Sequence, residues 1–134
     1  MIPACAPSVT AKSIAIVVAL MTQGIVQRDF SAIDRYISDG YINHNPQGTN
    51  GKGNVIGLLN AYPNLQYTAG GIVGNCDIVM LYGRYTNFGP KAIIGTDIFR
   101  IDLKTNKIVE HWDTLQPEVP TNETASGNPM FTYL

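Results

Sequence analysis

Two carboxylates and one imidazole lie close together in Gly95–Pro117, the segment GTDIFRIDLKTNKIVEHWDTLQP. Its alternating Ile, Phe, Val and Leu residues are typical of two β-strands joined by a turn. Asp97, His111 and Asp113 occupy positions that such strands usually give to apolar side chains. A buried carboxylate tends to hold a proton, and an imidazole can carry a charge beside it. Together the three groups could therefore donate and accept protons in general acid–base catalysis.

The pairing of the two strands decides whether these groups meet. Alternation places Asp97 and Phe99 on one face of the first strand. In the register that we favour, Ile101 pairs with Val109 across the turn. Phe99 then lies opposite His111, and Asp97 lies opposite Asp113. A slip by one residue would place Trp112 opposite Asp97 and would turn His111 to the other face. The sequence leaves both registers open, and a purely structural polar cluster at the rim of the sheet remains an alternative.

The elements that must position this hairpin indicate a single α+β domain covering residues 1–134. We expect an irregular start over residues 1–9, with Ser8 or Thr10 capping the first helix. An extended tail is expected over residues 117–134. Between them the pattern predicts helices to about residue 27, after Arg28-Asp29 and over 54–61. It predicts a brief strand followed by turns within 39–53, and long strands over 65–73, 78–88, 91–101 and 107–116.

Composition excludes several classes of function. Hydrophobic residues make up 45% of the 134 residues and charged residues 14%, so a packed core can form. The net charge of −1 and nine scattered Lys and Arg residues disfavour nucleic-acid binding. The apolar run Ser13–Met21 is too short to span a bilayer, and we interpret it as a buried helix rather than a signal segment. Cys5 and Cys76 are expected to be free thiols in a reducing compartment, which predicts a cytoplasmic protein, and a Cys5–Cys76 disulfide is the alternative. The small net charge also predicts no membrane partner.

Three passages resemble the SnoaL-like polyketide cyclases of the nuclear transport factor 2-like superfamily: YINHNPQGTNGKG, DIFRIDLKTNKIVEHWD and NETASGNPMF. The resemblance implies a cone-shaped barrel, in which a curved, mainly antiparallel sheet wraps around N-terminal helices and leaves a pocket in its mouth. It also implies a homodimer and chemistry that uses no metal or organic cofactor. Asp97 matches the acidic pocket position of several superfamily enzymes, which use it as an acid–base or oxyanion-binding group.

Departures from the ketosteroid isomerases of the same superfamily are informative. Their base aspartate precedes a proline, where this chain has Asn45 before Pro46. Their oxyanion tyrosine on the first helix corresponds to Met21. Steroid isomerisation is therefore not expected, and His44 is left as the candidate base. Only one of His44 and Asn45 can face inward on a strand, and alternation does not decide which.

These observations predict an enzyme that acts on a small apolar molecule next to a carbonyl group, by ring closure, aldol or retro-aldol chemistry, or isomerisation. The alternative is a non-catalytic domain that binds a small ligand or mediates dimerisation. The expected catalytic residues are Asp97, His44, His111 and Asp113, and the expected substrate contacts are Asn45, Met21, Phe99 and Tyr62.

Two further interpretations concern the pocket. Tyr62, Tyr67, Tyr82 and Tyr85 could line it around a ring-shaped ligand, although tyrosines in strands are more often plain packing. The two histidines and two aspartates could in principle bind a divalent metal. No two of them share the i, i+4 helical spacing of recognisable sites, so we expect no metal.

Overall fold

The computed structural model describes residues 5–134. Helices come first and strands dominate the second half of the chain, as expected for an α+β domain. The elements are α1 (Pro7–Ala19), the π-helix η1 (Leu20–Val26), α2 (Phe30–Tyr36), β1 (Ile37–Asn43), α3 (Gly53–Ala61), β2 (Gln66–Asn75), β3 (Ile78–Thr86), β4 (Ile93–Asp102), β5 (Lys107–Pro117) and the short 3-10 helix η2 (Thr121–Glu123).

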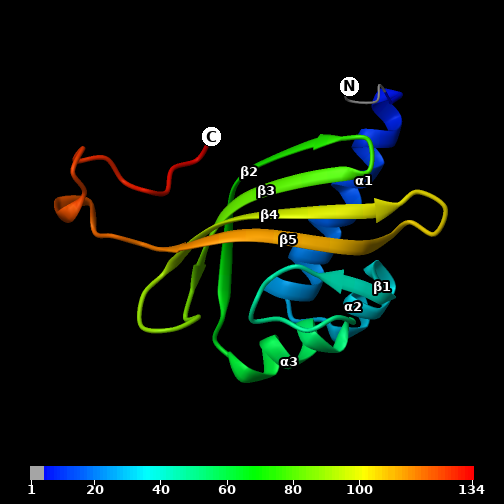
Figure 1. The fold of residues 1–134 in the computed structure, drawn as a ribbon, viewed down its shortest axis with the longest axis horizontal. Helices are drawn as coiled ribbons and strands as arrows, with labels where there is room; N and C mark the ends of the chain where they lie inside the picture. Colours follow the sequence, from blue (N-terminus) through cyan, green and yellow to red (C-terminus); the bar gives the residue numbers. More distant parts are fainter. Residues whose placement is uncertain (1–4) are drawn as a thin grey trace.

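The five strands form one sheet in the order β1-β5-β4-β3-β2. The predicted four-strand meander β2–β5 is antiparallel throughout, whereas β1 adds to the edge of the sheet parallel to β5. The sheet curves, and α1 crosses behind it while α2 and α3 lie below its open end (Figure 1). The predicted α+β cone, a curved and mainly antiparallel sheet around N-terminal helices, is confirmed. The sheet does not close on itself, so it is not the complete barrel that was expected.

The first helix forms the centre of the core. Val17, Leu20 and Met21 are buried against the sheet, because apolar residues recur along one side of α1 and η1. The segment Pro7–Val26 is long and apolar enough to cross a membrane by length and composition, with 39% of its residues buried in the domain. Packing of this helix in the core matches the interpretation of a buried helix.

The start of this helix differs from the expectation. Helix α1 begins at Pro7, inside the predicted irregular start, because proline needs no hydrogen-bond partner in the first turn. No side chain caps it, so neither Ser8 nor Thr10 has the expected role. Instead, the Thr10 hydroxyl accepts a hydrogen bond of 3.0 Å from the backbone N–H of Cys76.

The prediction of two free thiols is wrong. Cys5 and Cys76 form a disulfide, with their Cα atoms 5.4 Å apart. The bond joins the chain just before α1 to the turn between β2 and β3, across a sequence separation of 71 residues. Together with the Thr10 hydrogen bond, it attaches the beginning of the core helix to the end of the β2–β3 hairpin.

The β4–β5 hairpin has the favoured register where the polar residues lie. Asp97 pairs with Asp113, and Phe99 pairs with His111. Nearer the turn the pairing shifts, so that Ile101 lies opposite Ile108 rather than the predicted Val109. Such a β-bulge adds one residue to one strand, and it lets Ile108 point into the core without moving His111.

The C-terminal segment lies against the outer face of β2 and β3. The Tyr82 hydroxyl donates to the carbonyl of Met130 at 2.7 Å, and the Tyr82 ring stacks on Phe131. The backbone N–H of Leu134 donates to the carbonyl of Gly70 at 3.0 Å. A side chain on Gly70 would collide with Tyr82 and Phe131, so glycine permits this close contact of tail and sheet.

Candidate active site

A cavity of about 320 Å³ lies between the inner face of the sheet and the helices. Its lining is mainly aliphatic and aromatic, and it comes from all layers of the fold. Its ionisable Asp and His side chains come from β4 and β5, which form the polar wall beside the end of β1. The lining residues are Leu20, Met21, Ile25, Ile37, Tyr41, Asn43, Asn45, Gln47, Gly48, Asn54, Val55, Leu58, Tyr62, Leu65, Tyr85, Phe88, Asp97, Phe99, His111, Asp113 and Leu115.

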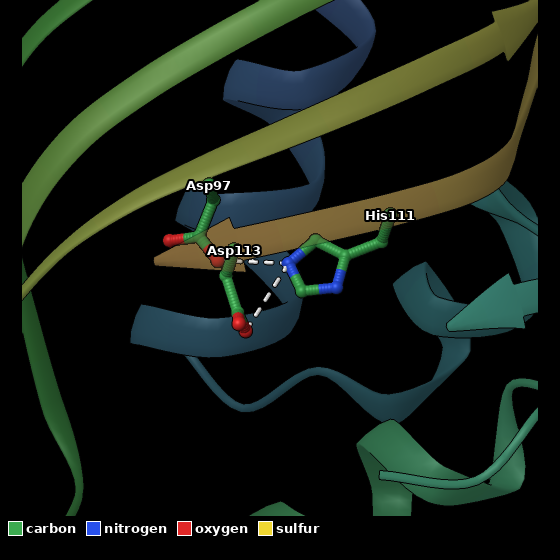
Figure 2. Close-up of side chains that lie close together, drawn as sticks. All are labelled: Asp97, His111 and Asp113. Carbon is green, nitrogen blue, oxygen red and sulfur yellow. Dashed lines mark hydrogen bonds and ion pairs between the residues drawn. The ribbon is translucent and has the colours of Figure 1, made fainter. Parts of the chain in front are cut away.

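The three polar residues of the hairpin meet at this wall. Nε2 of His111 lies 2.8 Å from Oδ1 of Asp97 and 3.8 Å from Oδ2 of Asp113. Figure 2 shows the imidazole pointing from β5 toward both carboxylates. Their side chains are only 10%, 5% and 9% exposed for His111, Asp97 and Asp113 respectively. A cluster of ionisable groups therefore lies at the boundary between the core and the cavity.

The neighbours of His111 determine how its ring is protonated. Nδ1 lies 3.1 Å from Oδ1 of Asn43, an oxygen that also accepts from the backbone N–H of Asn45. Because an amide oxygen only accepts, Nδ1 must carry a hydrogen. Nε2 is thus left to share a proton with Asp97, and the ring is held in place by packing against Phe99, at 5.1 Å between centroids.

Tyr85 fixes the other side of Asp97. Its hydroxyl lies 2.6 Å from Oδ2 of Asp97. Burial and the charge of Asp97 raise the pKa of Tyr85 well above its ordinary value, so the phenol stays protonated and donates this hydrogen bond. Burial likewise raises the pKa of Tyr41, which stacks near His111. Any proton held by Asp97 is consequently on Oδ1, facing His111.

Asn45 is the side chain that faces inward, and it contacts Asp113. Its amide nitrogen lies 2.9 and 2.8 Å from the two oxygens of Asp113, while its amide oxygen accepts from the backbone N–H of Gln47. The Gln47 contact sets the orientation of the amide, so that its N–H groups point at the carboxylate. Asp113 accepts on both oxygens, which is the arrangement of an ionised carboxylate.

His44, the candidate base in the sequence, is not among the residues that line the cavity. Its ring stacks on Trp112 at 4.8 Å between centroids, and its Nε2 lies 2.8 Å from Glu110. The guanidinium of Arg100 lies over the ring of Trp112, 5.6 Å from the ring centroid. These residues form an aromatic and ionic cluster on the outer face of the sheet.

Replacement of His44 provides a direct comparison with its neighbour. We expect His44→Gln to leave turnover within about twofold of wild type, because the side chain contacts only outer-face groups. Asn45→Leu removes the amide that holds Asp113 and should lower turnover by one to two powers of ten, roughly the value of one lost buried hydrogen bond to a charge. Steady-state kinetics of both variants would check this, and a large loss in His44→Gln would contradict the assignment.

The outer-face cluster also predicts a dependence of stability on pH. The hydrogen bond with His44, followed by the bonds and charge of Arg100, lowers the pKa of Glu110. A carboxylate with a lowered folded-state pKa stabilises the fold above its unfolded pKa, and this contribution is lost as pH falls. The melting temperature of Glu110→Gln should lie below that of wild type at pH 7, and the two should converge below about pH 4. A constant difference down to pH 3 would contradict the expectation.

The predicted substrate contacts Asn45, Met21, Phe99 and Tyr62 all line the cavity. Of the other tyrosines that sequence alone could not place, Tyr85 lines the cavity, Tyr82 lies on the outer face beneath the tail, and Tyr67 is buried without lining it.

Sequence reasoning missed Tyr41 and Asn43, which line the cavity beside His111. The signal was present in the strand YIN: with Asn45 these residues recur at every second position, as expected for one face of a strand.

The same cluster is the group that could hold a metal ion. The ligand atoms of Asp97, His111 and Asp113 lie within 4.8 Å of one another, whereas His44 is remote from them. Two carboxylates and one imidazole form a donor set that divalent ions accept. However, Nε2 of His111 already bonds Asp97, so an ion would have to displace the proton between them.

Comparisons of the sequence with protein-family profiles and with curated proteins find no match. Solved structures do match. A protein named as a ketosteroid isomerase from Kribbella flavida DSM 17836 superposes with a TM-score of 0.69 at 13% identity, covering 80% of this chain and 79% of that one. A protein named as a SnoaL-like polyketide cyclase from Jannaschia sp. CCS1 has a TM-score of 0.66 at 15% identity, covering 85% and 91%. An LEH-like epoxide hydrolase from M. tuberculosis has a TM-score of 0.63 at 17% identity, covering 80% and 84%.

The chain therefore has the α+β cone fold of the proteins named as ketosteroid isomerase and SnoaL-like polyketide cyclase, and this fold is the one that the resemblance in the sequence implied. At these identities the likeness establishes the fold, and the chemistry must be argued from the site.

Proposed function

We propose that the protein is an enzyme that uses cofactor-free acid–base chemistry next to a carbonyl group of a small, mainly apolar molecule. The observation that carries this proposal is the hydrogen-bonded pair of His111 and Asp97, buried at 10% and 5% exposure on the polar wall of an otherwise apolar cavity. Burial of ionisable groups at the wall of a cavity is expensive for stability, and it is typical of functional sites.

The hydrogen-bond pattern supports a division of roles. Asp113 accepts through both oxygens and is the candidate base that removes a proton from the carbon next to the carbonyl. The proton shared by His111 and Asp97 is the candidate for donation to the substrate oxygen as negative charge develops there. A base and an acid 3.8 Å apart on one wall would serve ring closure, aldol or retro-aldol cleavage, and isomerisation alike.

A panel of substrates with a pH–rate profile tests this proposal. Purified protein would be assayed with cyclic and open-chain β-keto compounds and, because one similar structure is named as an epoxide hydrolase, with epoxides of the same size. We expect turnover of carbonyl compounds and a bell-shaped profile that reports one acid and one base. Turnover of epoxides alone would replace carbonyl chemistry by epoxide hydrolysis. Binding without any turnover would favour the non-catalytic alternative.

A homodimer is part of the proposal, with the outer face of the sheet as the interface. Val73 pairs with Met80, Met80 with Ile98, and Ile98 with Trp112, so four apolar side chains form one row across β2, β3, β4 and β5. Val73 is 63% and Met80 39% exposed. Such a row of aliphatic and aromatic residues is well suited to a self-complementary interface.

Light scattering at micromolar concentration should report about twice the 14.6 kDa mass of the chain. Met80→Lys should return the protein to a monomer, because it places a charge in the middle of the row. Leu103→Lys is the matched control, since Leu103 is 47% exposed in the β4–β5 turn and outside the row. A monomer in the wild type, or equal effects of both variants, would contradict this interface.

A cytoplasmic location stays a prediction, and it depends on free thiols. The Cys5–Cys76 disulfide argues against it, because disulfides persist mainly in oxidising compartments.

A further inference from the structure

The charged side chains that line the cavity are mainly acidic. Among the described residues that line it, two are carboxylates and one is an imidazole, and none is Lys or Arg. Arg28 approaches the neighbourhood, but its guanidinium donates to the backbone carbonyls of Leu59 and Tyr62. Lys52 lies with Asp34 and Asp39 at 2.7 Å from each. Among the described residues that line the cavity, His111 is therefore the only side chain that can carry positive charge beside the two carboxylates.

The charge of the polar wall can be counted from its hydrogen bonds. One proton lies between Nε2 of His111 and Oδ1 of Asp97, so this pair is neutral overall on whichever atom the proton resides. Asp113 then remains as a carboxylate, and its nearest partner is the neutral amide of Asn45. The cavity thus carries about one uncompensated negative charge, at a side chain that is 9% exposed.

We propose that this cavity selects its ligand by charge: it takes a compact apolar molecule that bears a basic nitrogen, and the ammonium group lies against Asp113. A desolvated carboxylate without a cation is costly, and a ligand cation removes that cost when it binds. A carboxylate or phosphate on the ligand would face Asp113 in a medium of low dielectric constant and would be repelled. This inference rests on the proposed function for its choice of cavity, but its argument depends on charge alone.

An organic ammonium is a better occupant than a divalent metal ion. A metal bound by Asp97, His111 and Asp113 would need Nε2 without a hydrogen, and it would break the 2.8 Å bond to Asp97. An ammonium group can donate to an oxygen of Asp113 while the bond between His111 and Asp97 stays in place. The aromatic side chains of Tyr62 and Phe88, 4.8 Å apart between centroids, provide a surface for the apolar body of such a ligand.

Three naphthalene probes test the selection directly. 1-Naphthylmethylamine, 1-naphthylmethanol and 1-naphthoate share one ring system and differ in charge at pH 7. Their affinities would be measured by isothermal titration calorimetry with a chelator present. We expect the amine to bind about tenfold more tightly than the alcohol, and the carboxylate about tenfold or more weakly, as one partly desolvated charge pair allows. An alcohol that equals the amine, or a carboxylate that equals the alcohol, would overturn the proposal.

Two variants locate the effect. Asp113→Asn keeps the shape of the side chain and should reduce the ratio of amine to alcohol affinity to about one. Asp39→Asn is the matched control, because it is the same chemical change at a side chain 89% exposed outside the cavity. A preference that survives in Asp113→Asn would overturn the assignment. If that variant does not fold, the order of the three probes on the wild type still decides.

Metal ions form a separate arm of the experiment. Calorimetric titration with Zn²⁺ or Mg²⁺, without chelator, should give no binding that competes with the amine. Competition would overturn the organic cation in favour of a metal site. The outcome is independent of catalysis: the probe order can hold although no carbonyl compound is turned over, and turnover can occur without any preference for the amine.

Discussion

Replacement of Asp97 by Asn is expected to lower the rate of the chemical step by roughly two to four powers of ten, the usual contribution of one acid–base group. The variant keeps the shape of the side chain, and the amide can still accept the hydrogen bond from Tyr85. It cannot share a proton with Nε2 of His111, so the pair loses the proton that it would give to a substrate oxygen. Single-turnover kinetics with a substrate from the carbonyl panel would measure this step.

The control for this result is a second aspartate on the same strand. Asp102 lies at the β4–β5 turn, where Oδ1 accepts from the backbone N–H of Lys104, a bond that an amide oxygen can replace. Asp102→Asn should therefore keep both turnover and melting temperature near wild type. Normal turnover in Asp97→Asn together with an altered melting temperature would assign Asp97 a structural role and would reject the acid–base role.

Loss of the Cys5–Cys76 disulfide should be the largest effect on stability. The bond closes a loop across 71 residues of sequence. For a loop of this length the chain-entropy relation gives about 4 kcal/mol of stabilisation through the unfolded state. Small domains are stable by only about 5–15 kcal/mol, so Cys5→Ala should move the unfolding transition far toward lower denaturant concentration.

Urea denaturation with and without a reductant provides the comparison. The wild type should lose stability when reduced, whereas Cys5→Ala should be insensitive to the reductant because it has no disulfide to break. Turnover at low temperature should survive in both, since neither sulfur lines the cavity. A wild type that is unaffected by reduction would show that the bond contributes little in solution.

Alternation favoured the pairing of Asp97 with Asp113 but left a slip by one residue open, and the structure has the favoured pairing because β4 and this part of β5 are regular. Alternation failed at Val109, where a bulge inserts one residue next to a long turn. Local pattern does not reveal a bulge, since the inserted residue changes the phase without changing the composition.

The choice between His44 and Asn45 was open because alternation alone does not show which face of β1 is the inner one. In the structure the inner positions keep one alternation despite the irregular pairing with β5, and the residues of this face that line the cavity are Ile37, Tyr41, Asn43 and Asn45. Sequence alone could name the Cys5–Cys76 disulfide only as an alternative, because its formation depends on where β2 and β3 turn relative to the start of α1. Local spacing therefore favoured the acidic pair, whereas the tertiary arrangement decided its register and its partners.

The direct pairing of Asp97 with Asp113 has a consequence for redesign of the protein. Both residues belong to adjacent strands, so the separation of the two carboxylates is set by the backbone ladder of the sheet. Much of the opposite wall comes from helical side chains such as Met21, Val55 and Leu58. Substitutions there would change the size and shape of the molecule that is accepted without altering the spacing of the acid–base groups. A library confined to the helices should consequently yield variants that differ in substrate range and share one pH profile.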